Sequence, residues 1–166
     1  MRVIVVSGLS GSGKSVALHM LEDLGFYCID NLPAALLKPF ISHTVRSAES
    51  PYARSAIGLD ARNTAHEIAT VPRLIDELKR SGIDCEVLYL VASDEELLRR
   101  FAETRRKHPM SRERVGLSEA IDTERRLLEP IAYAADMIID TSKMGVHELR
   151  QVVRLRVEQR AVGRLS

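Results

Sequence analysis

The sequence GLSGSGKS occupies positions 8–15 and directly follows the apolar run Val3-Ile4-Val5-Val6. It matches the pattern G-x-x-x-x-G-K-[S/T] at every defined position, and it has the strand before it that this pattern requires. Glycines in such a loop let successive backbone N–H groups converge on phosphate oxygens, because no Cβ atom interferes. We therefore predict a phosphate-binding loop formed by Gly8, Leu9, Ser10, Gly11, Ser12, Gly13, Lys14 and Ser15.

The residue types in this loop also predict the chemistry of its ligand. The helix that begins near Lys14 directs the positive end of its dipole at the loop. Lys14 is suited to neutralise the β- and γ-phosphates of a nucleotide, and the Ser15 hydroxyl is suited to ligate Mg²⁺. The expected ligands are therefore ATP or GTP together with Mg²⁺.

The rest of the chain alternates short apolar runs with amphipathic stretches. Runs buried on both faces of a parallel sheet have this composition, so we predict strands at 3–7, 26–30, 56–60, 86–91 and 137–140. We predict helices at 14–24, 33–47 (kinked or divided by Pro39), 70–81, 94–106, 118–134 and 146–160. This alternation indicates an α/β fold with a doubly wound parallel sheet.

Two acidic residues each end a predicted strand, where such sheets bind their ligands. Asp60 is a candidate to orient a water bound to Mg²⁺, and Asp30 is a candidate base facing an acceptor or an attacking water. Aspartate also caps helices and begins turns, and this alternative is open for both residues. Lys14, Asp30 and Asp60 are the candidates for a catalytic role.

A basic segment, 105–117, fits neither the helical nor the strand period, so we predict a loop or lid there. Arg105 and Arg106 follow Arg99 and Arg100 on and beyond the end of a predicted helix. Their guanidinium groups match phosphate geometry, so they are candidates to close over a triphosphate. Two alternatives are open: cations favoured at a helix C-terminus, and contacts to an RNA backbone.

Composition limits the range of functions. The 166 residues correspond to one domain, and a formal net charge of +1 gives no global attraction to nucleic acid. Aromatic residues make up 4% of the chain and tryptophan is absent, which argues against an RNA-stacking platform. Cys28 and Cys85 lack metal-like spacing and are expected to be reduced thiols of a cytoplasmic protein. The sequence has no run long enough for a membrane span.

Several motifs together resemble one family, the RapZ-type P-loop nucleotide-binding proteins, known as RNase adapters in enteric bacteria. The resemblance is carried by SGLSGSGKSVAL, LEDLGFYCIDNLP, the DARN segment, RRFAETRRKHP, LLEP, and ADMIIDTS followed by VHEL. These motifs span nearly the whole chain, and GFYCIDNLP and TRRKHP are the most specific.

The resemblance implies an ATP- and GTP-binding domain with a P-loop kinase-like fold over 1–160. It also implies at most weak NTPase activity and the start of a linker over 161–166. Its ATP segment corresponds to positions 8–15, and its GTP segment to Asp60, Ala61, Arg62 and Asn63. A strand-end acid beside a phosphate loop suits Mg²⁺ better than a guanine edge, so we expect Ser15 and Asp60 to hold the metal. The resemblance further implies a C-terminal domain that binds a small regulatory RNA and an RNase, and self-association of the whole protein. That role controls amino-sugar metabolism in enteric relatives.

Two other functions are compatible with the residues. A small-molecule or nucleotide kinase has the same order of strand, phosphate loop, helix and arginine-rich lid, but it needs an acceptor site. Asp30 with the region 33–47 is the candidate for that site, without a recognisable acceptor signature. An RNA-binding module is the third possibility, and the neutral charge balance argues against it.

Overall fold

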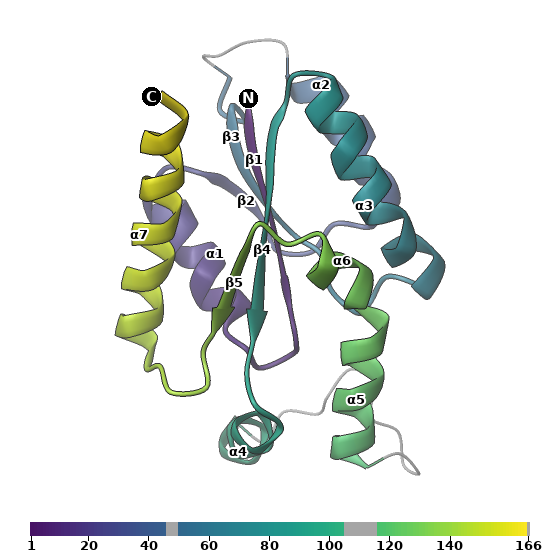
Figure 1. Ribbon diagram of the computed structural model, residues 1–166, viewed down its shortest axis with the longest axis vertical. Helices are drawn as coiled ribbons and strands as arrows, with labels where there is room; N and C mark the ends of the chain where they lie inside the picture. The colour runs from purple at the N-terminus through teal and green to yellow at the C-terminus, as the bar shows by residue number, and fades with distance from the viewer. Residues whose placement is uncertain (46–49, 105–115, 166) are drawn as a thin grey trace.

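Five parallel strands form a single sheet in the order β2-β3-β1-β4-β5 (Figure 1). The computed structural model describes residues 1–45, 50–104 and 116–165 of the chain. The strands are β1 (Arg2–Gly8), β2 (Tyr27–Ile29), β3 (Arg54–Gly58), β4 (Asp84–Val91) and β5 (Met137–Asp140). Each of the five predicted strands is present, so the predicted parallel sheet is confirmed.

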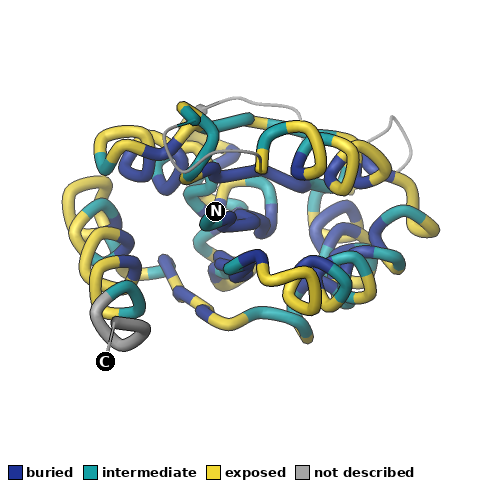
Figure 2. Tube along the Cα trace, turned by 90° about the horizontal axis from the view of Figure 1, so that it is seen from above, coloured by how far each residue is buried: buried dark blue, intermediate teal, exposed yellow. Residues whose placement is uncertain are grey.

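Helices cover both faces of this sheet (Figures 1 and 2). One face carries α1 (Lys14–Asp23) and α7 (Val146–Leu165), and the other carries α2 (Leu37–Thr44), α3 (Ala65–Arg80) and α6 (Glu129–Tyr133). A short 3-10 turn, η1 (Ala34–Leu36), precedes α2, and α4 (Asp94–Thr104) and α5 (Leu117–Leu127) lie beyond the carboxyl end of β4. This three-layer arrangement is the doubly wound fold expected from the sequence.

The apolar run of β1 explains why this strand is central. Val3, Ile4, Val5 and Val6 are all fully buried, and successive side chains point to opposite faces of the sheet. Val3 and Val5 pack in the core beneath α2, α3 and α6, whereas Ile4 and Val6 pack in the core beneath α1 and α7. A strand that is apolar on both faces therefore joins the two cores.

The strand order determines where the loop after β1 lies. The chain places β3 on one side of β1 and β4 on the other, so the connections at the carboxyl ends diverge at this point. Ligands bind in the crevice at such a switch point of an open α/β sheet. The sequence 8–15 begins at this crevice.

The predicted start of the third helix, at residue 70, is wrong. Helix α3 begins at Ala65, because Thr64 and Glu67 form a reciprocal capping box. The Thr64 hydroxyl accepts a hydrogen bond from the Glu67 N–H at 3.2 Å, and the Thr64 N–H donates to the Glu67 carboxylate at 3.3 Å. Pro72, typical of a first helical turn, instead lies inside this helix.

The predicted helix 118–134 is divided into α5 and α6. Pro130 lies in the first turn of α6, and proline has no N–H with which to continue the hydrogen-bond ladder of α5. The domain boundary predicted after residue 160 falls within α7, which extends to Leu165. Among residues 1–45, 50–104 and 116–165, no helix combines the length and apolarity needed to cross a membrane.

We predict that Thr64→Ala lowers the free energy of unfolding by about 1 kcal/mol, because it removes one side of the capping box. Thr123→Ala is the matched control, since Thr123 lies within α5 and its hydroxyl donates to the Glu119 carbonyl of the same helix. Alanine has the higher helix propensity, so this control is expected to be neutral or slightly stabilising. Urea denaturation of both variants measures the difference, and equal destabilisation would argue against the cap.

Candidate functional site

The loop 8–15 turns through positions where only glycine fits. A Cβ atom at Gly8 would lie 2.5 Å from the Leu90 carbonyl oxygen. Gly13 has a φ of +110°, and a Cβ there would lie 2.5 Å from a methyl carbon of Leu149. Leu9 has the opposite role, because its side chain is buried against Ala92, Leu97 and Ile121. The glycines let the loop approach β4 and α7 closely, and Leu9 anchors it.

Lys14 and Asp60 meet across the mouth of the loop. Val6 of β1 pairs with Gly58 of β3, so Asp60, two residues further, reaches the first residues of α1. The Lys14 Nζ atom donates to Asp60 Oδ2 at 2.9 Å, and both side chains are largely buried, with 15% and 14% exposed. The structure therefore places Asp60 beside the phosphate loop.

Asp60 has a second cationic partner, Arg62. The Arg62 Nη2 and Nε atoms donate to Asp60 Oδ2 at 2.7 and 3.1 Å. Burial acts to raise the pKa of Asp60, but hydrogen bonds from Arg62 and Lys14 outweigh it and hold the pKa well below the usual value of 3.8. Asp60 is therefore a carboxylate under all physiological conditions.

A buried acid on α5 holds the tip of the loop. Glu124 is only 1% exposed, and its carboxylate accepts from the Ser10 N–H at 2.7 Å and from the Ser10 hydroxyl at 2.5 Å. Glu124 was not among the residues predicted from the sequence. The spacing of Glu124 from Ile121 and Leu128 could have revealed it, because this spacing places an acid on the apolar face of the helix.

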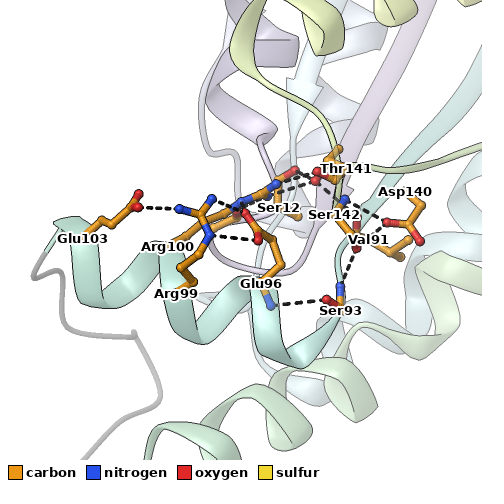
Figure 3. A network of polar contacts seen from close by, with 11 residues as sticks. Ser12, Val91, Ser93, Glu96, Arg99, Arg100, Glu103, Asp140, Thr141 and Ser142 are labelled. Atoms are coloured by element: carbon orange, nitrogen blue, oxygen red, sulfur yellow. Dashed lines mark hydrogen bonds and ion pairs between the residues drawn. The ribbon is translucent and has the colours of Figure 1, made fainter.

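A polar network ties the loop to β5 and α4 (Figure 3). The Thr141 hydroxyl donates to the Ser12 carbonyl at 2.6 Å. Arg100 donates through Nη1 to the Gly11 carbonyl at 2.9 Å and to the Thr141 hydroxyl at 3.0 Å, and Glu96 accepts from its Nε at 2.9 Å. The guanidinium of Arg100 is therefore fixed beside the loop.

These elements enclose a cleft of about 840 Å³. Most of the predicted site residues line it: Gly8, Leu9, Ser10, Gly11, Gly13, Lys14, Ser15, Asp30, Asp60, Ala61 and Arg62. Its lining also includes Val16, Arg99, Arg100, Phe101, Glu103, Met144, Gly145, Val146 and Leu149. The cleft thus joins the phosphate loop to α4 and to the connection between β5 and α7.

Ser12 and Asn63 do not line this cleft, although both were predicted from the sequence to bind the nucleotide. Ser12 is fully buried and contributes its carbonyl to the network of Thr141. Asn63 is 7% exposed, its Oδ1 accepts from the Ala34 N–H at 2.8 Å, and its Nδ2 donates to the Asp60 carbonyl at 3.2 Å. Asn63 therefore joins the connection after β2 to the connection after β3. Arg105 and Arg106 lie outside the described residues.

The donor groups in the cleft are those that Mg²⁺ prefers. Asp60 supplies an ionised carboxylate, and Ser15 supplies an exposed hydroxyl from the first turn of α1. Mg²⁺ takes one or two protein ligands and retains several waters, so this pair fits the ion without a dedicated cluster of acids. Asp30, an exposed residue one position beyond β2, provides a second carboxylate in the cleft.

We predict that Glu124→Ala lowers the free energy of unfolding by about 3 kcal/mol, because two donors of Ser10 lose a charged acceptor in a buried position. Ser10→Ala, which keeps the backbone bond, is expected to cost about 1.5 kcal/mol. The Ser10→Ala change should cost less in the Glu124→Ala background, and this coupling is the diagnostic quantity. Glu119→Ala, an exposed change on the same helix, is the control. If the two changes in unfolding free energy are additive in the double mutant, Glu124 and Ser10 do not interact as proposed.

The pKa of Asp60 predicts a pH dependence of stability. The pKa of Asp60 is lower in the folded chain than in the unfolded chain. The ionised carboxylate therefore stabilises the folded chain fully above about pH 5, and this stabilisation is lost as the pH falls. The advantage of the wild type over Asp60→Asn should shrink by about 1 kcal/mol between pH 5 and pH 3. Urea titrations at the two pH values measure it, and a constant difference would exclude a lowered pKa.

Curated relatives match nearly all of this chain. A nucleotide-binding protein of Methylococcus capsulatus is 51% identical over 157 residues, which cover 95% of this chain and 53% of the relative. A nucleotide-binding protein of Alkalilimnicola ehrlichii is 50% identical over 165 residues, which cover 99% of this chain and 57% of the relative. The chain therefore spans about half the length of the relatives it matches.

Two of the solved structures that share this fold are small-molecule kinases. Shikimate kinase from Acinetobacter baumannii, in complex with shikimate, has a TM-score of 0.56 at 16% identity, covering 96% of this chain and 94% of the kinase. A gluconokinase from Sinorhizobium meliloti has a TM-score of 0.55 at 18% identity, covering 98% and 97% of the two chains. At such low identity the likeness establishes the P-loop kinase fold and nothing finer.

The family model of the RapZ-like N-terminal domain matches residues 1–160, and the chain belongs to that family.

Proposed function

We propose that this chain binds a purine nucleoside triphosphate with Mg²⁺ and acts as the regulatory nucleotide-binding domain of a RapZ-like adapter protein. The observation that carries the proposal is the pair of Lys14 and Asp60, 2.9 Å apart, at the mouth of a glycine-rich loop that opens into a cleft. The relatives' name, nucleotide-binding protein, supports it.

The ion pair of Lys14 and Asp60 responds directly to nucleotide binding. In the structure the Lys14 ammonium is neutralised by Asp60, which also binds Arg62. A triphosphate in the loop offers Lys14 a stronger anionic partner, so Lys14 exchanges Asp60 for the β- and γ-phosphates. Asp60, still ionised, and the Ser15 hydroxyl are the groups that would hold a Mg²⁺ ion, which would neutralise part of the phosphate charge. ATP and GTP are the proposed nucleotides.

Membership of the RapZ-like family supports the regulatory role. We infer that RNA binding, RNase recruitment and self-association of a full-length protein involve the part of the relatives that this chain does not match. In this scheme the domain signals whether a nucleotide is bound, and it hydrolyses that nucleotide weakly at most.

A kinase is the second candidate, favoured by one observation. Asp30 is exposed in the same cleft as the phosphate loop, where an acceptor hydroxyl could approach. Incubation with γ-labelled ATP and pooled metabolites separates the two functions. Label that reaches a small acceptor faster than it reaches free phosphate, and that is lost in Asp30→Asn, would replace the regulatory proposal with phosphotransfer.

We predict that Lys14→Ala weakens binding of Mg²⁺–ATP and Mg²⁺–GTP by about 30-fold, since a charge-assisted contact to the phosphates is lost. The fold should persist, because Asp60 keeps Arg62 as a partner. Lys38→Ala is the matched control, since Lys38 lies on α2 and pairs with Glu77 at an exposed site. Calorimetry measures the affinities, and equal affinity of Lys14→Ala and wild type would refute the assignment.

A further inference from the structure

Helix α7 runs along one face of the sheet from its carboxyl end to its amino end (Figure 1). Its 20 residues correspond to a length of about 30 Å. Leu149, Val153 and Val157 form its buried side and share a core with residues of α1 and β1. The first turn therefore lies at the cleft, and the later turns lie at the opposite end of the sheet.

The cleft end of α7 is packed directly against the phosphate loop. A Cβ atom at Gly13 would lie 2.5 Å from a methyl carbon of Leu149 and 4.0 Å from Thr141 Cγ2. The Thr141 hydroxyl also donates to the Ser12 carbonyl at 2.6 Å (Figure 3). Because protein interiors are close-packed, a change in the backbone at Gly13 cannot leave Leu149 undisturbed.

The far end of α7 is fastened to the sheet by a buried acid, Glu86 of β4. Glu86 is fully buried and pairs in register with Ile4, which places both side chains on the face beneath α7. Its carboxylate accepts from Arg2 Nη2 at 3.2 Å and from Arg160 Nε. Arg2 Nη2 also donates to the Val157 carbonyl at 3.1 Å. A buried carboxylate depends on such partners, so it is a strong anchor for this part of the helix.

The sequence between the two ends favours an unbroken helix. Positions 146–162 contain neither glycine nor proline, the residues at which helices most often kink. The matching family model is an N-terminal domain, and the matched region is about half of the curated relatives. In a protein of that length the remaining part would follow α7. This helix therefore joins the phosphate loop to the position from which such a part would continue.

We propose that α7 carries the signal of nucleotide occupancy, with Leu149 as its contact at the phosphate loop and Glu86 as its anchor at the far end. Phosphates in the loop restrict the backbone at Gly13, and this restriction stabilises the packing of Leu149 and the anchored position of α7. The inference rests on the proposed nucleotide binding and names the element through which that binding is signalled. Such coupling is reciprocal, so loosening the anchor must weaken nucleotide binding.

Amide hydrogen exchange of the wild-type chain tests the coupling without any substitution. With saturating Mg²⁺–ATP, we expect the amides of residues 154–161 to exchange about fivefold more slowly than in the free chain. Helix α3, on the other face of the sheet, is the internal control. Equal slowing in α3 would show general stabilisation of the fold, and unchanged exchange in 154–161 would show that α7 does not respond. Either result would overturn the inference.

A variant at the far end tests the reciprocal effect. Arg160→Ala is expected to weaken Mg²⁺–ATP binding about fivefold, although Arg160 does not line the cleft. The fold should persist, since Glu86 keeps Arg2 as a partner. Arg160→Lys retains a cation for Glu86 and should recover most of the affinity. Arg154→Ala is the matched control on the same helix, because Arg154 is 52% exposed and pairs with Glu158.

The outcomes separate this inference from the proposed function. Calorimetry that finds wild-type affinity in Arg160→Ala, or the same loss in Arg154→Ala, would overturn the role of α7 while nucleotide binding stands. Slowed exchange confined to the phosphate loop and α1 would have the same meaning. If the wild-type chain takes up no Mg²⁺–ATP and no Mg²⁺–GTP, the proposed function itself is wrong.

Discussion

The backbone of the phosphate loop is held from outside by side chains from three separate elements. Glu124 of α5 binds the Ser10 N–H, Arg100 of α4 binds the Gly11 carbonyl, and Thr141 binds the Ser12 carbonyl from the end of β5. These bonds fix the path of the loop. A loop already arranged in this way loses little conformational entropy when an anion binds.

Opposite charges compensate one another in this site. A glycine-rich loop, a helix N-terminus and several cations concentrate positive potential in the cleft. Asp60 offsets it through two cations, Lys14 and Arg62, and its lowered pKa is the measure of that stabilisation. The same acid is suited to hold a metal-bound water.

Much of the fold and part of the site could be predicted from local patterns. The five strands follow from apolar runs, and the loop 8–15 follows from residue types at fixed spacing. The start of α3 was missed because Pro72 resembles a first-turn proline, while the capping box of Thr64 and Glu67 lay outside the expected range. Glu124 was missed because its role depends on a contact with Ser10, 114 positions away in sequence. Asn63 was assigned to the ligand, yet its amide is used to join two connections.

The sequence by itself determined the phosphate loop, the parallel sheet and the acid that follows β3, because each depends on neighbouring residues or on a short period. Only the tertiary structure decided which side chains hold the loop and which hold the two ends of α7. Those properties arise where β1, β4, β5 and the helices after them converge, and residues far apart in sequence meet there. Hydrogen bonds and burial between such residues are set by the packing of whole elements, which no local pattern encodes.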